Sequence, residues 1–122
     1  MSYVPPADFS YYVSKFFTEY MMKRRNASSH TILSYRDTFS LLLQFCICKG
    51  LRIEKMPVNS IDKELICDFL AWLADERKCG VSTQNQRLAA THAFFRFIQM
   101  EEPKYLLTAQ SILAILFQIS DM

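Results

Sequence analysis

The sequence predicts an all-α protein, a bundle of four amphipathic helices followed by an apolar fifth helix. Apolar side chains recur at helical spacing in each of these segments, and no segment shows a strand pattern of comparable strength. Only two of the 122 residues are glycine, whereas β-sandwiches and barrels need many tight turns. With 51% hydrophobic residues the chain can bury a sizeable core, and its length suits one domain.

The first two helices are predicted on either side of a short polar break. The first begins after Asp8, which we expect to cap it, and ends at the basic run 23–25. The second begins at Ser28 or Ser29 and stops at Gly50, because glycine suits the left-handed conformation that ends many helices. The apolar stripe of the first helix is Phe9, Val13, Phe16, Phe17, Tyr20 and Met21, and the buried face of the second is Tyr35, Phe39, Leu42, Leu43, Cys46 and Ile47.

The third helix is predicted to begin at Ser60 or Asp62, after a connector that contains Pro57. The fourth begins at Ser82, which we expect to cap it, and runs to about Met100. The predicted core positions are Leu65, Ile66, Phe69, Leu70 and Leu73 in the third helix, and Leu88, Thr91, His92, Phe95 and Ile98 in the fourth.

The fifth helix is predicted over residues 108–118. Its side chains are apolar nearly all round, so we expect it to be buried on more than one side. Residues 1–7 are predicted to form an extended tail, and residues 8–122 a single helical domain.

The composition narrows the class of function. The formal net charge of +2 is a weak signal, so the placement of the charges matters more than their sum. Four cysteines and no secretory signal favour a reduced, cytoplasmic protein. The Cys46-Ile47-Cys48 pair lacks a matching second pair or histidine cluster, so we expect no metal site and no cofactor. No apolar run reaches the length of a membrane span, so we expect no membrane partner.

Side chains suited to catalysis are sparse. His30 and His92 have no carboxylate at metal-ligand spacing, and the sequence contains no HExxH motif, glycine-rich phosphate loop or nucleophile elbow. His92 falls within the apolar rhythm of its helix and is most simply a histidine at the edge of the core. A stand-alone enzyme is therefore the least favoured class.

Two helix starts carry side chains suited to nucleic acid. Hydroxyls and free backbone N–H groups at a helix start suit phosphate oxygens, whereas amides and guanidinium groups can reach base edges in the major groove. The alternative is that both starts are ordinary solvated helix caps. The residues concerned are Ser82, Thr83, Asn85, Gln86 and Arg87 in the fourth helix, and His30, Thr31, Ser34 and Arg36 in the second, which follows the basic run 23–25.

Three segments, taken in order, resemble the core-binding domain of tyrosine recombinases, the phage integrases and their transposon relatives. Residues 29–39, with Leu42, Phe45 and Cys46 behind them, resemble the second helix of that domain, and Ile66, Phe69-Leu70, Trp72-Leu73 and Arg77 resemble its third. Residues 82–98 are similar to its fourth helix, with the pattern S-T-x-N-x-R-L-x-A-x-x-x-F-x-R-F. Residues 110–115 resemble the segment that leads toward the catalytic domain.

The resemblance implies an orthogonal four-helix SAM-like bundle that forms half of a C-shaped clamp on double-stranded DNA. The second and fourth helices would face the major groove, with DNA-facing side chains at His30, Thr31, Ser34, Ser82, Thr83, Asn85, Gln86 and Arg87, and with phosphate contacts at Arg36 and Arg96. The catalytic Arg, Lys, His and Tyr of the family belong to a separate C-terminal domain, so none is assigned here and we expect the chain to be non-catalytic in isolation.

Two departures from the family pattern stand out. The family often has proline and lysine after the position of Ile115, where this chain has Leu116 and Gln118, and His92 replaces a common arginine. The apolar end suggests an alternative function: a protein-interaction or self-association module, or a contact with a catalytic domain, through residues 107–119.

Overall fold

The computed structural model describes residues 6–119, apart from the side chain of Arg24; residues 1–5 of the predicted tail and residues 120–122 lie outside it. Within this range every regular element is helical, which confirms the all-α prediction. The elements are α1 (Phe9–Lys15), the π-helix η1 (Phe16–Arg24), α2 (Ser29–Cys48), the 3₁₀ turns η2 (Ile53–Lys55) and η3 (Val58–Ser60), α3 (Lys63–Asp75), α4 (Val81–Glu101), the 3₁₀ turn η4 (Pro103–Tyr105) and α5 (Leu106–Leu113).

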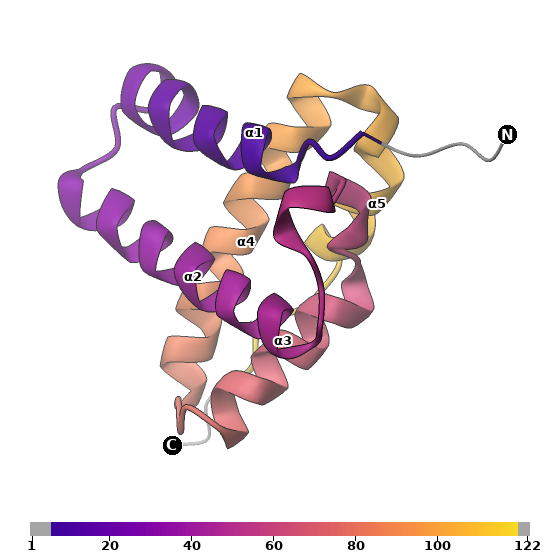
Figure 1. Ribbon diagram of the computed structural model, residues 1–122. Coiled ribbons are helices and arrows are strands. Elements are labelled where there is room, and N and C mark those ends of the chain that lie inside the picture. The colour runs from indigo at the N-terminus through magenta and orange to yellow at the C-terminus, as the bar shows by residue number, and fades with distance from the viewer. Residues whose placement is uncertain (1–5, 120–122) are drawn as a thin grey trace, which may run out of the picture.

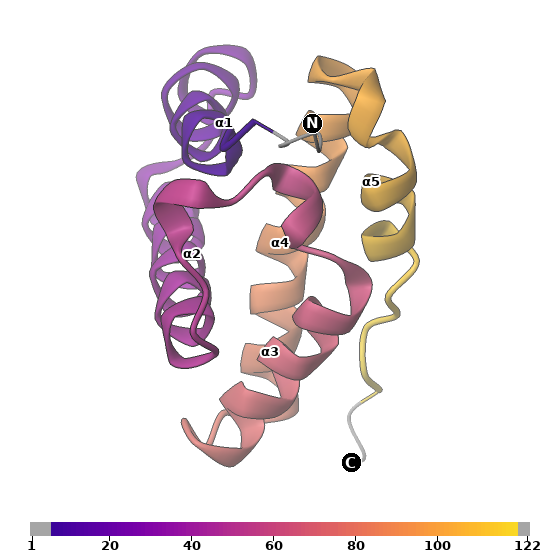
Figure 2. The ribbon, with the colours of Figure 1, turned by 45° about the vertical axis from the view of Figure 1, so that its right-hand side comes forward.

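Helix α4 is the central element of the bundle. It contacts α2, α3, α5 and η1, and Figure 1 and Figure 2 show α2 and α5 on opposite sides of it. The α1–η1 segment lies across one end of the bundle, above the crossing of α2 and α4 (Figure 1). No helix in the described range combines the length and hydropathy that a membrane span needs.

Aromatic rings fill the core between η1, α2 and α4. The Phe16 ring lies at the centre of this cluster, with centroid distances of 5.5 Å to Phe94, 5.6 Å to Phe97 and 6.2 Å to Phe39. All four rings are buried, and burial of each such side chain stabilises the fold by about 1.5–3 kcal/mol. The aromatic cluster therefore holds η1 and α2 against α4.

The first helix departs from the prediction because it continues as a π-helix rather than an α-helix. The backbone N–H of Arg25 donates to the carbonyl oxygen of Tyr20, five residues earlier, at 2.9 Å. Four bulky side chains of this segment are buried, as the apolar stripe predicted: Phe16, Phe17, Tyr20 and Met21.

Three of the predicted helix boundaries are confirmed. The Ser28 hydroxyl accepts from the Thr31 N–H at 3.2 Å, and the Asp62 carboxylate accepts from the Leu65 N–H at 2.8 Å. Gly50 adopts a positive φ of 82°, as expected where a helix ends in the left-handed conformation.

Two predicted caps need correction. Asp8 lies at the N-cap of α1, as predicted, but its side chain makes no cap hydrogen bond; its carboxylate instead accepts from the Val58 N–H at 3.0 Å and from the Tyr105 hydroxyl at 2.6 Å. The N-cap of α4 is Gly80, two residues before the predicted cap, so Ser82 lies within the first turn.

The predicted burial and length of two helical segments also need correction. Ile47 is exposed rather than buried, although Phe45 and Cys46 of the same turn are buried, because consecutive side chains of a helix point about 100° apart and Ile47 lies on the outer side. Helix α5 ends at Leu113 rather than near Gln118, and residues 115–119 run without helical structure. Hydrogen bonds between this segment and the start of α4, described below, replace the helix that was predicted.

Candidate nucleic-acid interface

A trough lies between the first turns of α2 and one face of α4. It consists of two adjoining concavities of about 310 Å³ and 180 Å³, which share the lining residues Thr31 and Tyr35. The larger is also lined by His30, Ser34, Gln86 and Ala89, and the smaller by Tyr20, Met21, Arg25, Ala27, Ala93 and Arg96. We call the two concavities together the α2–α4 trough.

The spacing of small side chains along α4 explains why this face is hollow. Gln86, Ala89, Ala93 and Arg96 are three, four and three residues apart, which places them on one stripe of the helix. The two alanines leave a low floor between the longer side chains at each end. Opposite them, α2 presents the short side chains of its first turns, among them Ser34.

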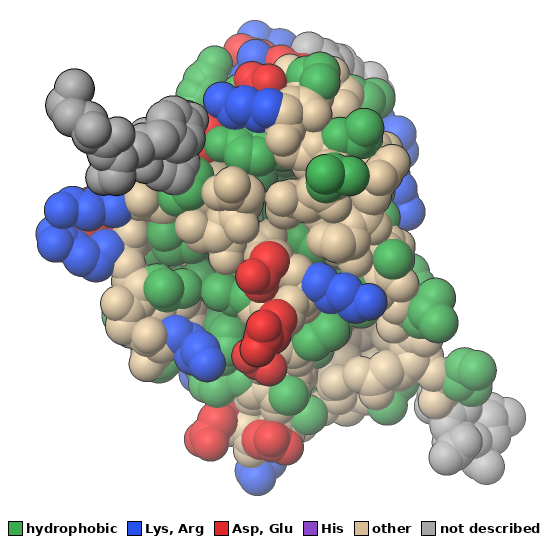
Figure 3. All heavy atoms as spheres, turned by 90° about the vertical axis from the view of Figure 1, so that its right-hand side faces the viewer, with side chains coloured by type: hydrophobic (Ala, Val, Ile, Leu, Met, Phe, Trp, Pro, Cys, Tyr) green, Lys and Arg blue, Asp and Glu red, His purple; other side chains and the backbone are tan. Residues whose placement is uncertain are grey.

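Among the described residues, no Asp or Glu lines either concavity of the trough. A concavity beside α3, as open as the larger one of the trough, is instead lined by Asp62, Glu64 and Asp68. Figure 3 shows acidic side chains in a row on the face at the right of Figure 1, and no histidine is visible there.

The structure brings together five of the predicted site residues in the α2–α4 trough. They are His30, Thr31, Ser34, Gln86 and Arg96. Ser82 is exposed one turn before Gln86 on the same face of α4, and Thr83 is half-buried. Arg36 is exposed, lines neither concavity, and has its guanidinium 5.8 Å from the centroid of the Phe17 ring.

Arg87 lies between the two helices instead of facing outward. Its guanidinium Nη1 donates to the Ser34 carbonyl oxygen at 3.3 Å and to the Thr38 Oγ1 at 3.2 Å. Its Nε is buried and has no hydrogen-bond partner among the described residues. Arg87 therefore braces α2 against α4 at the level of the trough.

Asn85 binds the segment that follows α5. Its Nδ2 donates to the Gln118 carbonyl oxygen and its Oδ1 accepts from the Gln118 N–H, both at 2.9 Å. The side chain of Gln118 also donates to the Gln84 Oε1 at 2.6 Å. We call residues 115–119 the docked segment, since these bonds attach it to the first turn of α4.

His92 is buried on the α5 side of α4, as its place in the apolar rhythm predicted. Its ring packs edge-on against Phe117 of the docked segment, with centroids 5.1 Å apart. Burial lowers the pKa of His92, and the positive charge of Arg96 acts in the same direction. The histidine is therefore a neutral packing residue at neutral pH.

The described residues include no group of three or more His, Cys, Asp or Glu that could hold a metal ion. The four cysteines are free, and burial raises the pKa of the Cys46 thiol to about 11. The thiol of Cys46 is therefore protonated at neutral pH and is not an activated nucleophile.

Three polar residues of the trough were not among the predicted site residues: Tyr20, Arg25 and Tyr35. Tyr20 and Tyr35 fit the apolar stripes, which predict core positions, although both also line the trough. Arg25 belongs to the basic run 23–25, which predicted the end of the first helix and not a binding residue. The alanine spacing on α4 was the available signal for the hollow face.

Comparison with known proteins identifies the family. Residues 14–103 match the family described as phage integrase, N-terminal SAM-like domain. A protein named as an integrase/recombinase, y4rC, of Sinorhizobium fredii is 40% identical over 107 residues, which cover 84% of this chain and 31% of that protein. A second, y4rD of the same organism, is 33% identical over 107 residues, which cover 84% of this chain and 37% of that protein.

The chain thus spans about a third of the length of these two relatives. No solved structure matches it at a significant level. The family match extends from α1 to the start of η4 and so includes both walls of the trough. The resemblance to tyrosine recombinases is confirmed, and the chain belongs to the phage integrase N-terminal SAM-like domain family.

Proposed function

We propose that this chain binds double-stranded DNA through the α2–α4 trough, as the DNA-holding part of a site-specific recombinase of a mobile element. Strand cleavage and rejoining would be performed by a catalytic domain that these residues do not include. The membership of the integrase family and the names of the two relatives support this assignment.

The observation that carries the proposal is the chemistry of the trough. Hydroxyl, imidazole and amide side chains from two facing helices, among them Ser34, His30 and Gln86, converge in a hollow without carboxylates. Amide side chains can bond an adenine edge in the major groove, and hydroxyls bond either bases or phosphates. An acidic lining would instead repel the phosphate backbone.

The walls of the trough are held rigidly enough to present these groups together. Arg87 joins α4 to α2, and the aromatic cluster around Phe16 fixes η1 against both helices. Side chains on well-packed helices keep their geometry better than side chains on loops, which favours a binding surface that is preformed.

Fluorescence anisotropy with a pool of randomised duplexes, followed by selection of the bound sequences, tests the proposal. We expect binding that weakens as salt rises, because phosphate contacts release counterions. Gln86→Ala should relax the base preference by about 1–3 kcal/mol at one position, whereas Gln110→Ala, an exposed glutamine on α5, should not. Absence of binding to every duplex at low salt would contradict the proposal.

A second candidate is self-association, or docking of another domain, through the exposed apolar side chains of α5 and the docked segment. Leu107, Leu116 and Ile119 are 80%, 84% and 90% exposed. Deletion of this region would remove Ala109 and Ile112 from the core, so the better test replaces Leu107, Leu116 and Ile119 with glutamine. Light scattering should then show a smaller species than the wild-type chain; a wild-type monomer would contradict self-association.

A further inference from the structure

We propose that Arg25 and Arg96 form a seat for a phosphate group at one end of the α2–α4 trough. In the complex with duplex DNA, the occupant would be a phosphodiester of the backbone. This inference rests on the proposed DNA-binding function. It adds Arg25 and a defined cavity to the phosphate contact that the family resemblance implied for Arg96.

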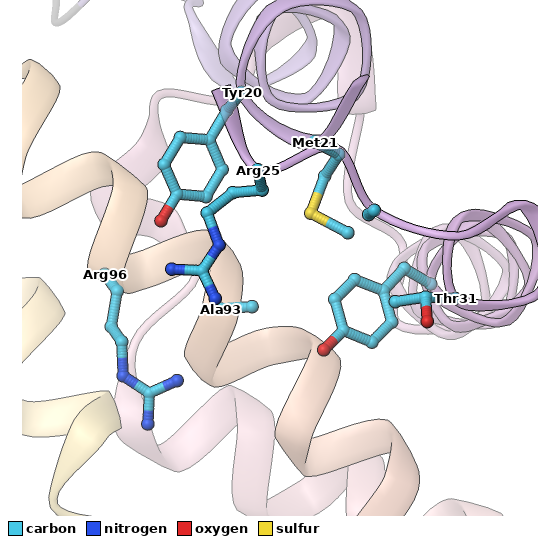
Figure 4. Close-up of a pocket in the computed structure, with 8 residues that line it drawn as sticks. Tyr20, Met21, Arg25, Thr31, Ala93 and Arg96 are labelled. Atoms are coloured by element: carbon cyan, nitrogen blue, oxygen red, sulfur yellow. The ribbon is translucent and has the colours of Figure 1, made fainter. Parts of the chain in front are cut away.

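The two arginines come from different elements and line one cavity. Arg25 is the C-cap of the π-helix η1, Arg96 lies on α4, and both line the concavity of about 180 Å³. Figure 4 shows the Arg25 guanidinium beside the Tyr20 ring and near Ala93, whereas the Arg96 side chain extends downward and its guanidinium lies below that of Arg25. Since one water occupies roughly 30 Å³ in the liquid, this space admits a tetrahedral phosphate.

Among the described residues, neither arginine forms an ion pair, and no described Asp or Glu lines the cavity. Both side chains are exposed and both line the cavity, so its charge favours an anion over a cation.

The remaining lining groups suit a phosphate better than a carboxylate. The side chains of Thr31, Tyr20 and Tyr35 each carry a hydroxyl that can donate to an additional oxygen. The Tyr20 ring lies 5.9 Å from the Arg25 guanidinium, which steadies that side chain at the edge of the cavity. Two guanidinium groups and several hydroxyls match the oxygens of a phosphodiester.

The position of the seat agrees with the geometry of a duplex. It shares Thr31 and Tyr35 with the larger concavity, where the candidate base-reading side chains Ser34 and Gln86 lie. Base edges lie in the middle of the major groove and phosphates at its rim, so a base-reading region should be flanked by a phosphate site. Arg25 and Arg96 would therefore fix the register of the trough on the DNA.

The test compares two double variants. The arginine variant carries Arg25→Gln and Arg96→Gln. The control carries Lys55→Gln and Lys63→Gln, which remove the same amount of positive charge from exposed positions outside the trough. Anisotropy is measured across a salt series with selected and unrelated duplexes. We expect the arginine variant alone to bind both kinds of duplex with an affinity roughly tenfold or more below that of wild type. We also expect the slope of log K against log salt to fall by about 0.9 for each phosphate that the variant no longer neutralises. Thermal unfolding should be unchanged, because both arginines are exposed.

A second arm titrates inorganic phosphate into the wild-type chain and follows the amide resonances of Thr31 and Ala93, which line the cavity. If the wild-type chain binds DNA but the arginine variant behaves like the lysine control, the backbone-phosphate seat is overturned while the proposed function stands. If phosphate shifts these resonances and the variant still binds DNA normally, the occupant is a free anion, and the proposal is again overturned. If no duplex binds, the proposed function fails. In that case the phosphate site is still supported if inorganic phosphate shifts these resonances in the wild-type chain but not in the arginine variant, and it is overturned if phosphate causes no shift.

Discussion

Arg87 on α4 donates to Thr38 on α2, with 3.2 Å between its Nη1 and the threonine Oγ1. Thr38 is 1% exposed, so this bond lies inside the bundle. The same nitrogen bonds the carbonyl oxygen of Ser34, whose residue lines the trough. Arg87, which was expected to face DNA, thus sets the spacing between α2 and α4, the two helices proposed to bind the DNA.

We predict that Arg87→Ala lowers the free energy of unfolding by about 1–3 kcal/mol, because it removes hydrogen bonds to a charged group in a partly buried place. Arg87→Lys should lose most of this stability, since an ammonium group does not reproduce the planar fork of a guanidinium. Urea unfolding measures both. Gln86→Ala, a neighbouring exposed position, should stay within about 0.5 kcal/mol of wild type; an Arg87→Ala variant that is equally stable would contradict the bracing role.

The paired hydrogen bonds between Asn85 and Gln118 predict that Asn85→Ala releases the docked segment. The expected loss of stability is about 1–2 kcal/mol, because two exposed hydrogen bonds disappear. The Gln118 amide should lose protection from hydrogen exchange, and proteases should cut residues 115–119 sooner. Ser82→Ala, in the same turn but without such a bond, is the control. Unchanged exchange at Gln118 would show that the Gln118–Gln84 hydrogen bond and the packing of Phe117 hold the segment without Asn85.

His92 makes stability depend on pH in a definite direction. Its pKa is lowered in the folded chain, mainly by burial, so the unfolded chain binds a proton first as the pH falls below the ordinary value of 6.5. Stability should therefore be full above that pH and decrease below it, by at most about 1.4 kcal/mol per pH unit. Urea unfolding between about pH 7.5 and 5.5 should show this decrease in wild type and in His30→Gln, but not in His92→Phe. An equal decrease in stability in the wild type and in both variants would mean that a group other than His92 causes it.

Asp8 connects the start of α1 to two distant parts of the chain, although it was predicted only as a cap. We predict that Asp8→Ala lowers the free energy of unfolding by about 2–3 kcal/mol, because the buried Val58 N–H and the Tyr105 hydroxyl lose their acceptors. The pKa of Tyr105 is raised by burial and by this bond, so it should fall in the variant, as an ultraviolet titration would show. Ser10→Ala, exposed in the same helix, should change neither quantity.

The buried faces were predictable because helical periodicity reports directly on burial. The core positions predicted in α4, from Leu88 to Ile98, are all buried. The end of α5 was not predictable in this way, since apolar side chains surround the whole segment and give no direction. Its end is set by the hydrogen bonds of Gln118 with Asn85, a residue 33 positions away.

In the candidate site too, some features were predictable from the sequence and others were not. Residue type indicates that Asn85, Gln86 and Arg87 form hydrogen bonds, but consecutive side chains of a helix point about 100° apart. Asn85 accordingly bonds the docked segment, Gln86 lines the trough and Arg87 bonds α2. Which of the three stays available to DNA depends on the packing of neighbouring elements, which residue type alone does not reveal.

The most direct test of the DNA-binding trough is an NMR titration of this chain with a selected duplex. We predict that the largest amide shifts fall on the residues that line the trough, His30, Thr31, Ser34 and Gln86, while Asp62, Glu64 and Asp68 near α3 stay unchanged. The shifts should diminish as salt is raised. Shifts that centre on α3 or on the docked segment, with the trough unaffected, would contradict the account.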